Sequence, residues 1–236
     1  MAQFVVAIDG YAGSGKSTTA KAVAQRLRFL YLDTGAMYRA FTYKYLNRVG
    51  AERIDPAVVQ ELIQGTMIDL VTGEGETRVL LDDRDVSQEI RTPRINRFVS
   101  PISAVPEIRA YMVRRQREIA AGQKVVCEGR DIASVVFPDA QVKIYMDADL
   151  RTRAIRRLRE LKEMGIETTL DDVLKNLKFR DDYDSSRAHS PLRRTADSIL
   201  VDTTDLTIEE EIALVERIVR EKLRHPDGHF NDSEPQ

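Results

Sequence analysis

The sequence predicts an α/β fold in which a parallel sheet is flanked by helices. Short apolar runs alternate along the chain with longer segments whose apolar residues recur at helical spacing, a pattern typical of such sheets. The expected strands are residues 4–8, 29–32, 124–127, 142–146 and 198–201, and the clearest expected helices are 150–164 and 206–223. The first strand ends in a glycine-rich loop, and we expect it near the middle of the sheet.

That loop, residues 10–17, reads Gly-Tyr-Ala-Gly-Ser-Gly-Lys-Ser and matches the phosphate-loop pattern G-x-x-x-x-G-K-S/T. Glycines let the backbone wrap closely enough for several N–H groups to point at phosphate oxygens, and the following helix adds its positive end. Lys16 would contact the β and γ phosphates and Ser17 the Mg²⁺. A chance glycine turn is the alternative, but a buried-type strand precedes this loop and a helical segment follows it. We therefore expect the P-loop NTPase fold.

The residues expected to hold the triphosphate are Gly10, Gly13, Ser14, Gly15, Lys16, Ser17, Thr18 and Arg157, with Ser17 as the metal ligand. The cofactor expected with ATP is Mg²⁺.

Composition limits the kinds of partner. The 236 residues are 42% hydrophobic and 31% charged, which suits a globular protein with one sizeable core and an insertion or two. Lys and Arg number 36 against 38 Asp and Glu, a net charge of −2, so no bulk field favours nucleic acid or an anionic membrane. No apolar stretch approaches the roughly 20 residues that span a bilayer, and no secretory signal is recognisable. We expect a cytoplasmic monomer whose single cysteine, Cys127, is a core residue.

The region 67–86 departs from the alternation of strand and helix. Two runs of alternating apolar residues flank a turn that contains Gly73 and Gly75, which is a hairpin signal. We therefore expect a small antiparallel β insertion outside the main sheet. Residues 225–236 are rich in Pro, Gly, Asp, Asn and Ser and predict a flexible tail.

Two short segments at the ends of expected strands carry charged residues. In residues 32–39, Asp33 or Thr34 can cap a helix, and Arg39 lies about one and a half turns into it, where it can clamp a phosphate. An ordinary turn with a surface arginine is the alternative. Arg130 and Asp131 follow another strand, at the edge where open α/β sheets bind ligands. A structural salt bridge is the alternative there.

A third charged region combines residues 180–187 with three arginines of the preceding helix. Arg153, Arg156 and Arg157 share one helix face by their spacing. They flank Gly165, which resembles a hinge, and two helices that can close over a nucleotide as a lid. A solvated, charge-alternating surface is the alternative.

At these residues the chain resembles the bacterial cytidylate kinases of the nucleoside monophosphate kinase group. The likeness extends from the phosphate loop to the final helix, and its further motifs are residues 86–92, 114–117, 135–140 and 180–182. It implies ATP or dATP as donor and CMP or dCMP as acceptor. It also implies a core of residues 1–34, 122–150 and 190–224, a monophosphate-binding part of 35–121 that contains the insertion, and a lid of 151–189, before the tail.

The resemblance also implies roles for individual residues. The acceptor phosphate would be held by Thr34, Arg39, Arg130 and Arg187, the cytosine edge by Ser100, Arg109 and Asp131, and the ribose by Arg180 and Asp184. The catalytic side chains would be Lys16, Arg130 and Arg187. The chain departs from the family pattern at Glu128, where Asp is common, at Ala133-Ser134, which replace Gly-Thr, and at Tyr183 in a segment that is often more basic.

The chemistry of such a transfer needs no general base. The second phosphate pKa of a nucleoside monophosphate is roughly 6, so the attacking oxygen is ionised at neutral pH. Lysine, arginines and Mg²⁺ would carry the catalysis by positioning and charge neutralisation. The alternatives are a uridylate, adenylate or shikimate kinase, or a nucleotide-binding switch without transfer. The Asn-Lys-x-Asp segment expected of a GTPase-type switch does not occur in the sequence.

Overall fold

The computed structural model describes residues 3–51, 53–73 and 76–225. The strands are β1 (Phe4–Gly10), β2 (Leu30–Asp33), β3 (Ile68–Gly73), β4 (Glu76–Leu81), β5 (Arg84–Asp85), β6 (Lys124–Gly129), β7 (Val142–Asp147) and β8 (Ile199–Asp202). The α-helices are α1 (Lys16–Leu27), α2 (Thr34–Val49), α3 (Pro56–Gln64), α4 (Pro93–Ser103), α5 (Pro106–Ala120), α6 (Leu150–Glu163), α7 (Leu170–Ser186) and α8 (Ile208–Arg224). Two short helical turns are η1 (Glu89–Arg91) and η2 (Ile132–Val136), the latter a π-helix.

The central sheet confirms the predicted fold class. Its five strands run parallel in the order β2-β6-β1-β7-β8, so the strand that carries the glycine-rich loop lies in the middle. All five expected strands are present, with ends that differ from the prediction by one or two residues. Because the strands are parallel, the turns after β1, β2 and β6 meet at one edge of the sheet.

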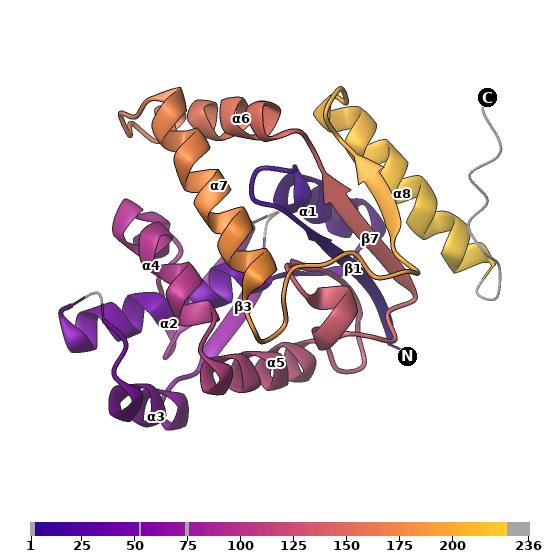
Figure 1. The fold of residues 1–236 in the computed structure, drawn as a ribbon. Helices are drawn as coiled ribbons and strands as arrows, with labels where there is room; N and C mark the ends of the chain where they lie inside the picture. The colour runs from indigo at the N-terminus through magenta and orange to yellow at the C-terminus, as the bar shows by residue number, and fades with distance from the viewer. Residues whose placement is uncertain (1–2, 52, 74–75, 226–236) are drawn as a thin grey trace.

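Side chains of β1 alternate between two apolar clusters, one on each face of the sheet. Val5 and Ala7 belong to the cluster under α2 and α5, whereas Val6 and Ile8 belong to the cluster under α1 and α8. This period of two is what a strand covered on both faces requires. Figure 1 shows α8 and α1 beside β7 and β1, with α2, α3, α4 and α5 gathered at the other end of the molecule.

The β insertion forms a separate sheet, as predicted. Strands β3, β4 and β5 pair antiparallel in that order, and their apolar residues pack into the same cluster as α2 and α5. The third strand, β5, has two exposed residues and therefore no apolar pattern by which to predict it. The centre of the predicted turn, residues 74–75, lies outside the described residues.

Helices α6 and α7 form a hairpin with a small apolar cluster of their own. Its buried members are Ala154, Val173 and Leu177, and Ala12 of the glycine-rich loop packs against them. Gly165, between the helices, has a φ of 72°. In Figure 1, α7 runs from the tip of this hairpin down between the β1–β7 region and α4. The domain boundaries stay a prediction, and most of the predicted tail, residues 226–236, lies outside the described residues.

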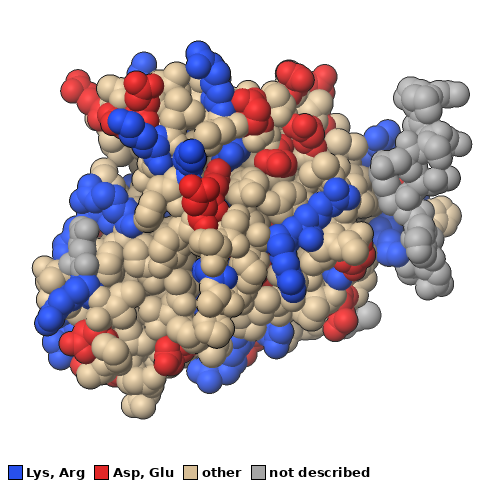
Figure 2. All heavy atoms as spheres, in the orientation of Figure 1, with Lys and Arg blue, Asp and Glu red and all other residues tan. Residues whose placement is uncertain are grey.

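Basic and acidic side chains are interspersed on the face drawn in Figure 2, and both kinds lie over the α6–α7 hairpin at the top of the view. Across the described residues, no helix combines the length and the apolar character needed to cross a membrane. Cys127 is fully buried, as predicted.

Candidate active site

The glycine-rich loop connects the central strand β1 to α1. Gly10, its first residue, has a φ of 148°, and a Cβ there would lie 1.9 Å from the carbonyl oxygen of Met146 on β7. No residue with a side chain fits this position unless the backbone moves. Gly10 therefore lets the loop leave the sheet while β7 stays paired with β1.

Side chains hold three carbonyl groups of the loop. The acceptors are the carbonyl oxygens of Tyr11, Ala12 and Ser14. Their donors are, in the same order, the Lys16 ammonium at 2.5 Å, the Arg153 guanidinium at 3.2 Å and the Thr203 hydroxyl at 3.1 Å. In a planar trans peptide the carbonyl and the next residue's N–H point in opposite directions. Fixing the carbonyls on one side therefore fixes the following N–H groups on the other, as an anion cradle requires.

Lys16 is a buried cation at the floor of this loop. Its residue is 4% exposed. Burial lowers the pKa of the ammonium to about 7, and the nearby Arg130 adds to the shift, while Glu128 and Asp9 oppose it. A phosphate beside Lys16 would favour the charged form, because an opposite charge within a few ångströms offsets desolvation. The position suits recognition of an anion.

Glu128, at the end of β6, stands beside Ser17. The Tyr31 hydroxyl donates a hydrogen bond to Glu128 Oε1 at 3.0 Å, and Ser17 also hydrogen-bonds this carboxylate. Burial, and then the nearby Asp33, raises the pKa of Glu128. In the sequence, Glu128 is notable only because it stands where the family commonly has Asp. Its contact with Ser17 could not be predicted, because this contact depends on the pairing of β6 with β1.

The oxygens of Ser17 and Glu128 fit Mg²⁺, which prefers hard oxygen ligands and keeps several waters or phosphate oxygens. Among residues 3–51, 53–73 and 76–225, no group of three or more His, Cys, Asp or Glu side chains is arranged to hold a metal ion. A site that completes its ligand shell with substrate phosphates does not need such a group.

The turn after β2 begins the second half of the site. Asp33 rather than Thr34 caps α2, because its carboxylate accepts the Ala36 N–H at 2.8 Å. The Thr34 hydroxyl instead donates to the carbonyl oxygen of Glu128 at 2.7 Å, which links the turns after β2 and β6. Burial lowers the pKa of Arg39, which faces the same pocket.

Carboxylates hold two further arginines of this half, Arg130 and Arg109. Arg130 Nε donates to Asp184 Oδ2 at 2.9 Å, and Arg109 pairs with Asp131, both being buried. Arg187 lies 3.9 Å from Asp131. The salt bridges that were the alternative explanation for Arg130 and Asp131 therefore exist, and the same arginines line the pocket.

Positive charge in this half exceeds what the carboxylates satisfy. Among the described side chains, Arg109 Nε, Arg180 Nε and Arg187 Nη2 are buried and have no hydrogen-bond partner in the protein. Burial lowers the pKa of Arg180 to about 9, and the neighbouring cations Arg130 and Arg39 add to the shift. Crowded guanidinium groups with unused donors suit a phosphate, which accepts several charge-assisted hydrogen bonds.

One pocket joins the two halves. It is lined by Gly13, Gly15, Lys16, Ser17, Thr18 and Arg157 at the loop end, and by Thr34, Arg39, Ser100, Arg109, Arg130, Asp131, Arg180, Asp184 and Arg187 at the other end. These are all the predicted site residues except Gly10 and Ser14, which do not line the pocket. Residues not predicted as ligands that also line it include Tyr38, Val99, Ser103, Glu160 and Leu177.

The three arginines of α6 do not share the one environment that their spacing on a single helix face predicts, but reach three different places. Arg153 packs against the phosphate loop, whereas Arg156 pairs with the buried Glu211 of α8 at 3.1 Å. Arg157 alone lines the pocket, and it pairs with Glu160 at 2.8 Å. Helix α6 begins where the loop, α8 and α7 meet, so neighbouring side chains on one face reach different elements.

Asp9, which the sequence analysis did not identify, links the end of β1 to the turn η2 after β6. It precedes Gly10, is almost fully buried, and accepts the N–H groups of Ile132 at 2.7 Å and Ala133 at 2.8 Å. Burial raises the pKa of Asp9 to about 7, although these amides oppose the shift. Ala133, a departure from the family pattern, lies in η2 without a positive φ, so the missing glycine leaves this turn unstrained.

A phosphate loop on a central parallel strand, sharing one pocket with a cluster of arginines, defines a P-loop protein with two anion sites. The family model described as cytidylate kinase matches residues 6–221. Two curated cytidylate kinases illustrate the relationship. The one from Carboxydothermus hydrogenoformans is 45% identical over 92% of this chain and 97% of its own. The one from Caldanaerobacter subterraneus subsp. tengcongensis is 48% identical over 93% of this chain and 96% of its own. The chain therefore belongs to the cytidylate kinase family.

One solved structure shows a weaker similarity. An uncharacterized protein from Eubacterium ventriosum aligns with a TM-score of 0.49 and 12% identity, covering 93% of this chain and 99% of that chain. The family assignment rests on the sequence relatives.

Proposed function

We propose that the protein transfers a phosphoryl group from ATP to CMP or dCMP, giving ADP and CDP or dCDP. The observation that carries this proposal is the single pocket with a phosphate loop at one end and buried, incompletely paired arginines at the other. A switch that only binds a triphosphate has no use for the second cationic site. Membership of the cytidylate kinase family supports the choice of acceptor.

At the donor end, the loop amides and Lys16 would bind the β and γ phosphates of ATP. Ser17 and Glu128 would hold the Mg²⁺ ion, which would neutralise part of the charge on the phosphates. The hydrogen bond between Ser17 and Glu128 supports this pairing. Thr18 and Arg157, which line the same end, would complete the triphosphate site.

At the acceptor end, different side chains would bind the phosphate, the base and the ribose of CMP. Thr34, Arg39, Arg130 and Arg187 would hold the phosphate of CMP. Ser100 with the Arg109–Asp131 pair would contact the cytosine edge, because a paired donor and acceptor can recognise a base edge that offers both. Arg180 and Asp184 would contact the ribose.

The reaction requires that two phosphates meet in line while water is excluded. Arg130 and Arg187 would neutralise charge on the transferring group from the acceptor side, and Lys16 from the donor side. No base is needed, since the attacking phosphate oxygen is ionised at neutral pH. The lid hairpin would keep out water that could otherwise accept the phosphoryl group. That the protein acts as a monomer in the cytoplasm stays a prediction.

The test is formation of ADP from MgATP by the purified protein, with CMP, dCMP, UMP, AMP, shikimate or no acceptor. We expect strong turnover with CMP and dCMP over a low background, and matching formation of CDP or dCDP. Turnover with another acceptor alone would move the proposal to that kinase. Equal ADP release with and without acceptors would contradict phosphoryl transfer to a second nucleotide.

A further inference from the structure

One arginine joins the phosphate loop to the lid helix that carries acceptor contacts. Arg153, on the first turn of α6, is 5% exposed. Its Nη1 atom donates a hydrogen bond to the carbonyl oxygen of Ala12 at 3.2 Å and lies 2.8 Å from Oδ2 of Asp181 on α7. A single guanidinium nitrogen therefore connects the two elements.

On the donor side, Arg153 sets the direction of a loop amide. The Ala12 carbonyl and the Gly13 N–H belong to one trans peptide, so holding the carbonyl toward Arg153 turns this N–H the opposite way. The guanidinium carbon also lies 5.0 Å from the centre of the Tyr11 ring. A Cβ at Gly13 would approach the carbonyl oxygen of Arg153 to 3.1 Å, so the loop and α6 touch closely. The position of Arg153 thus determines how the loop presents Gly13 to the pocket.

On the acceptor side, Asp181 belongs to the same helix as two proposed CMP contacts, Arg180 and Asp184. It follows Arg180 directly, and Asp184 lies three residues further on, which places both carboxylates on neighbouring parts of one helix face. Asp184 holds Arg130, which lines the acceptor end. Helix α7 therefore offers Asp181 to the donor loop, through Arg153, and Asp184 to the acceptor site.

Apolar packing contributes little to holding this geometry. Its apolar cluster is much smaller than the two clusters that flank the central sheet. The side chain of Asp181 is largely buried, with 16% of it exposed. Removing one partner of a buried ion pair leaves the other charge uncompensated, so the pair strongly disfavours positions of α7 that break it. The lid and the loop then move together.

We propose that the Arg153–Asp181 ion pair couples the two nucleotide sites, an inference that rests on the proposed function. Binding of ATP at the loop stabilises the placement of Arg153, which holds α7 where it binds CMP, and CMP on α7 stabilises the loop in return. Such coupling is reciprocal, because each ligand shifts the same equilibrium. Arg153 and Asp181 are positioning residues, which act through the Gly13 amide and through the neighbouring contacts of α7.

The test compares the dissociation constant of CMP with and without a saturating, non-hydrolysable ATP analogue and Mg²⁺, measured by calorimetry on the full chain. In the wild type we expect the analogue to strengthen CMP binding about tenfold. In Asp181→Asn we expect this ratio to fall below about twofold. Asp182→Asn is the matched control, because it makes the same change at an exposed neighbour on the same helix and should keep the wild-type ratio.

A second variant tests the pair from the other side and decides the matter if Asp181→Asn does not fold. Arg153→Lys keeps the charge, but one ammonium cannot reproduce the contacts with Ala148, Ala12 and Asp181 together, so the ratio should fall here too. A wild-type ratio near one, or an unchanged ratio in a folded Asp181→Asn or Arg153→Lys protein, overturns the inference alone. Failure of the wild type to bind CMP at all overturns the proposed function and this inference with it.

Discussion

The two ends of the pocket are built for anions by different means. The donor end is one continuous segment, residues 10–17, in which backbone amides are aimed by side chains that hold the opposite carbonyls. The acceptor end gathers guanidinium groups from α2, α5, α7 and the turn after β6, and carboxylates such as Asp131 and Asp184 hold them. A backbone cradle can be recognised in eight consecutive residues. A cradle of side chains exists only once the chain has folded.

Because the two ends are built differently, mutations at each end should have different effects. Changes at the donor end should remove catalysis, since we propose that Lys16 acts on the transferring group. Changes at the acceptor end should alter the requirement for CMP and leave that for ATP nearly intact. Changes between the ends should be smaller and should depend on pH.

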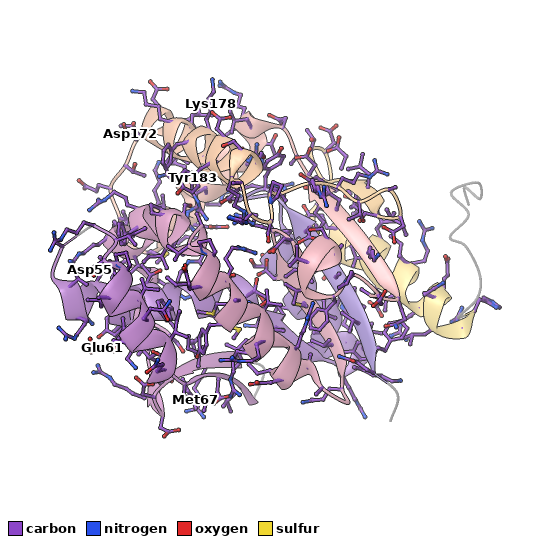
Figure 3. All side chains as sticks on the ribbon, turned by 60° about the horizontal axis from the view of Figure 1, so that its bottom comes forward. Asp55, Glu61, Met67, Asp172, Lys178 and Tyr183 are labelled. Atoms are coloured by element: carbon purple, nitrogen blue, oxygen red, sulfur yellow. The ribbon has the colours of Figure 1, made fainter. Side chains whose placement is uncertain are left out.

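The largest effect is expected for Lys16→Ala. The variant loses the buried ammonium, and loss of one preorganised group that stabilises developing charge costs about 10²–10³-fold or more in kcat. The measurement is the initial rate of CDP formation at saturating MgATP and CMP. Lys178→Ala, on the exposed outer side of α7 and labelled in Figure 3, serves as the control and should retain its rate. A Lys16→Ala protein within tenfold of the wild type would remove Lys16 from the mechanism.

A smaller, selective effect is expected for Asp184→Ala. Its carboxylate holds Arg130 at 2.9 Å, and loss of a charged hydrogen bond of this kind is worth about 1.5–3 kcal/mol. We expect KM for CMP to rise by about one to two orders of magnitude, and KM for ATP by less than about threefold. Full kinetics in both substrates check this. Equal increases in the two KM values would contradict the assignment of Asp184 to the acceptor.

The smallest effect concerns Asp9, which lies between the two ends, and it appears as a dependence of stability on pH. The folded state raises the pKa of Asp9 from 3.8 to about 7. Between these values the folded protein keeps the proton and the unfolded chain releases it, so stability falls as pH rises through this range. Asp9→Asn cannot titrate. Relative to the wild type, its free energy of unfolding should therefore increase with pH by at most about 1.4 kcal/mol per unit and level off above pH 7.

Urea unfolding across this pH range measures the difference between Asp9→Asn and the wild type. Asp55→Asn is the matched control, because its carboxylate also accepts a backbone N–H, that of Ala57, but caps the exposed end of α3. Figure 3 shows Asp55 on the part of the molecule away from the lid. Only a slope for Asp9→Asn that exceeds the slope of the control is assigned to Asp9. Equal slopes for the two variants would contradict the raised pKa of the Asp9 carboxyl.

The sequence predicts the fold and the donor end well because both rest on local patterns. Apolar runs mark all five strands of the central sheet, and the loop pattern identifies Lys16 and Ser17 without help from any relative. The two-residue strand β5 escapes prediction because it has no apolar pattern. The acceptor residues Ser100, Asp131 and Asp184 came together in the prediction only through the family resemblance, because no spacing in the chain relates them.

The contacts that escaped prediction share one physical cause. Asp9 binds amides 123 and 124 residues away, and Arg153 binds an acidic residue on another helix. A lone aspartate after a strand, or an arginine on a charged helix, carries no sign of its partner in the sequence. When such residues are buried, their charged groups hold parts of the site in place. Which residues are buried depends on how α6 and η2 pack, and the local sequence does not show this.

The most direct test of a pocket that holds two nucleotides is the binding of adenosine and cytidine joined 5′ to 5′ by a chain of phosphates. Linking two ligands that fit one pocket raises affinity by about 10² or more over the better single ligand. We expect this compound to compete with both ATP and CMP, and both Lys16→Ala and Asp184→Ala to weaken its binding. A compound that binds no more tightly than ATP and competes with ATP alone would contradict a second nucleotide site in this pocket.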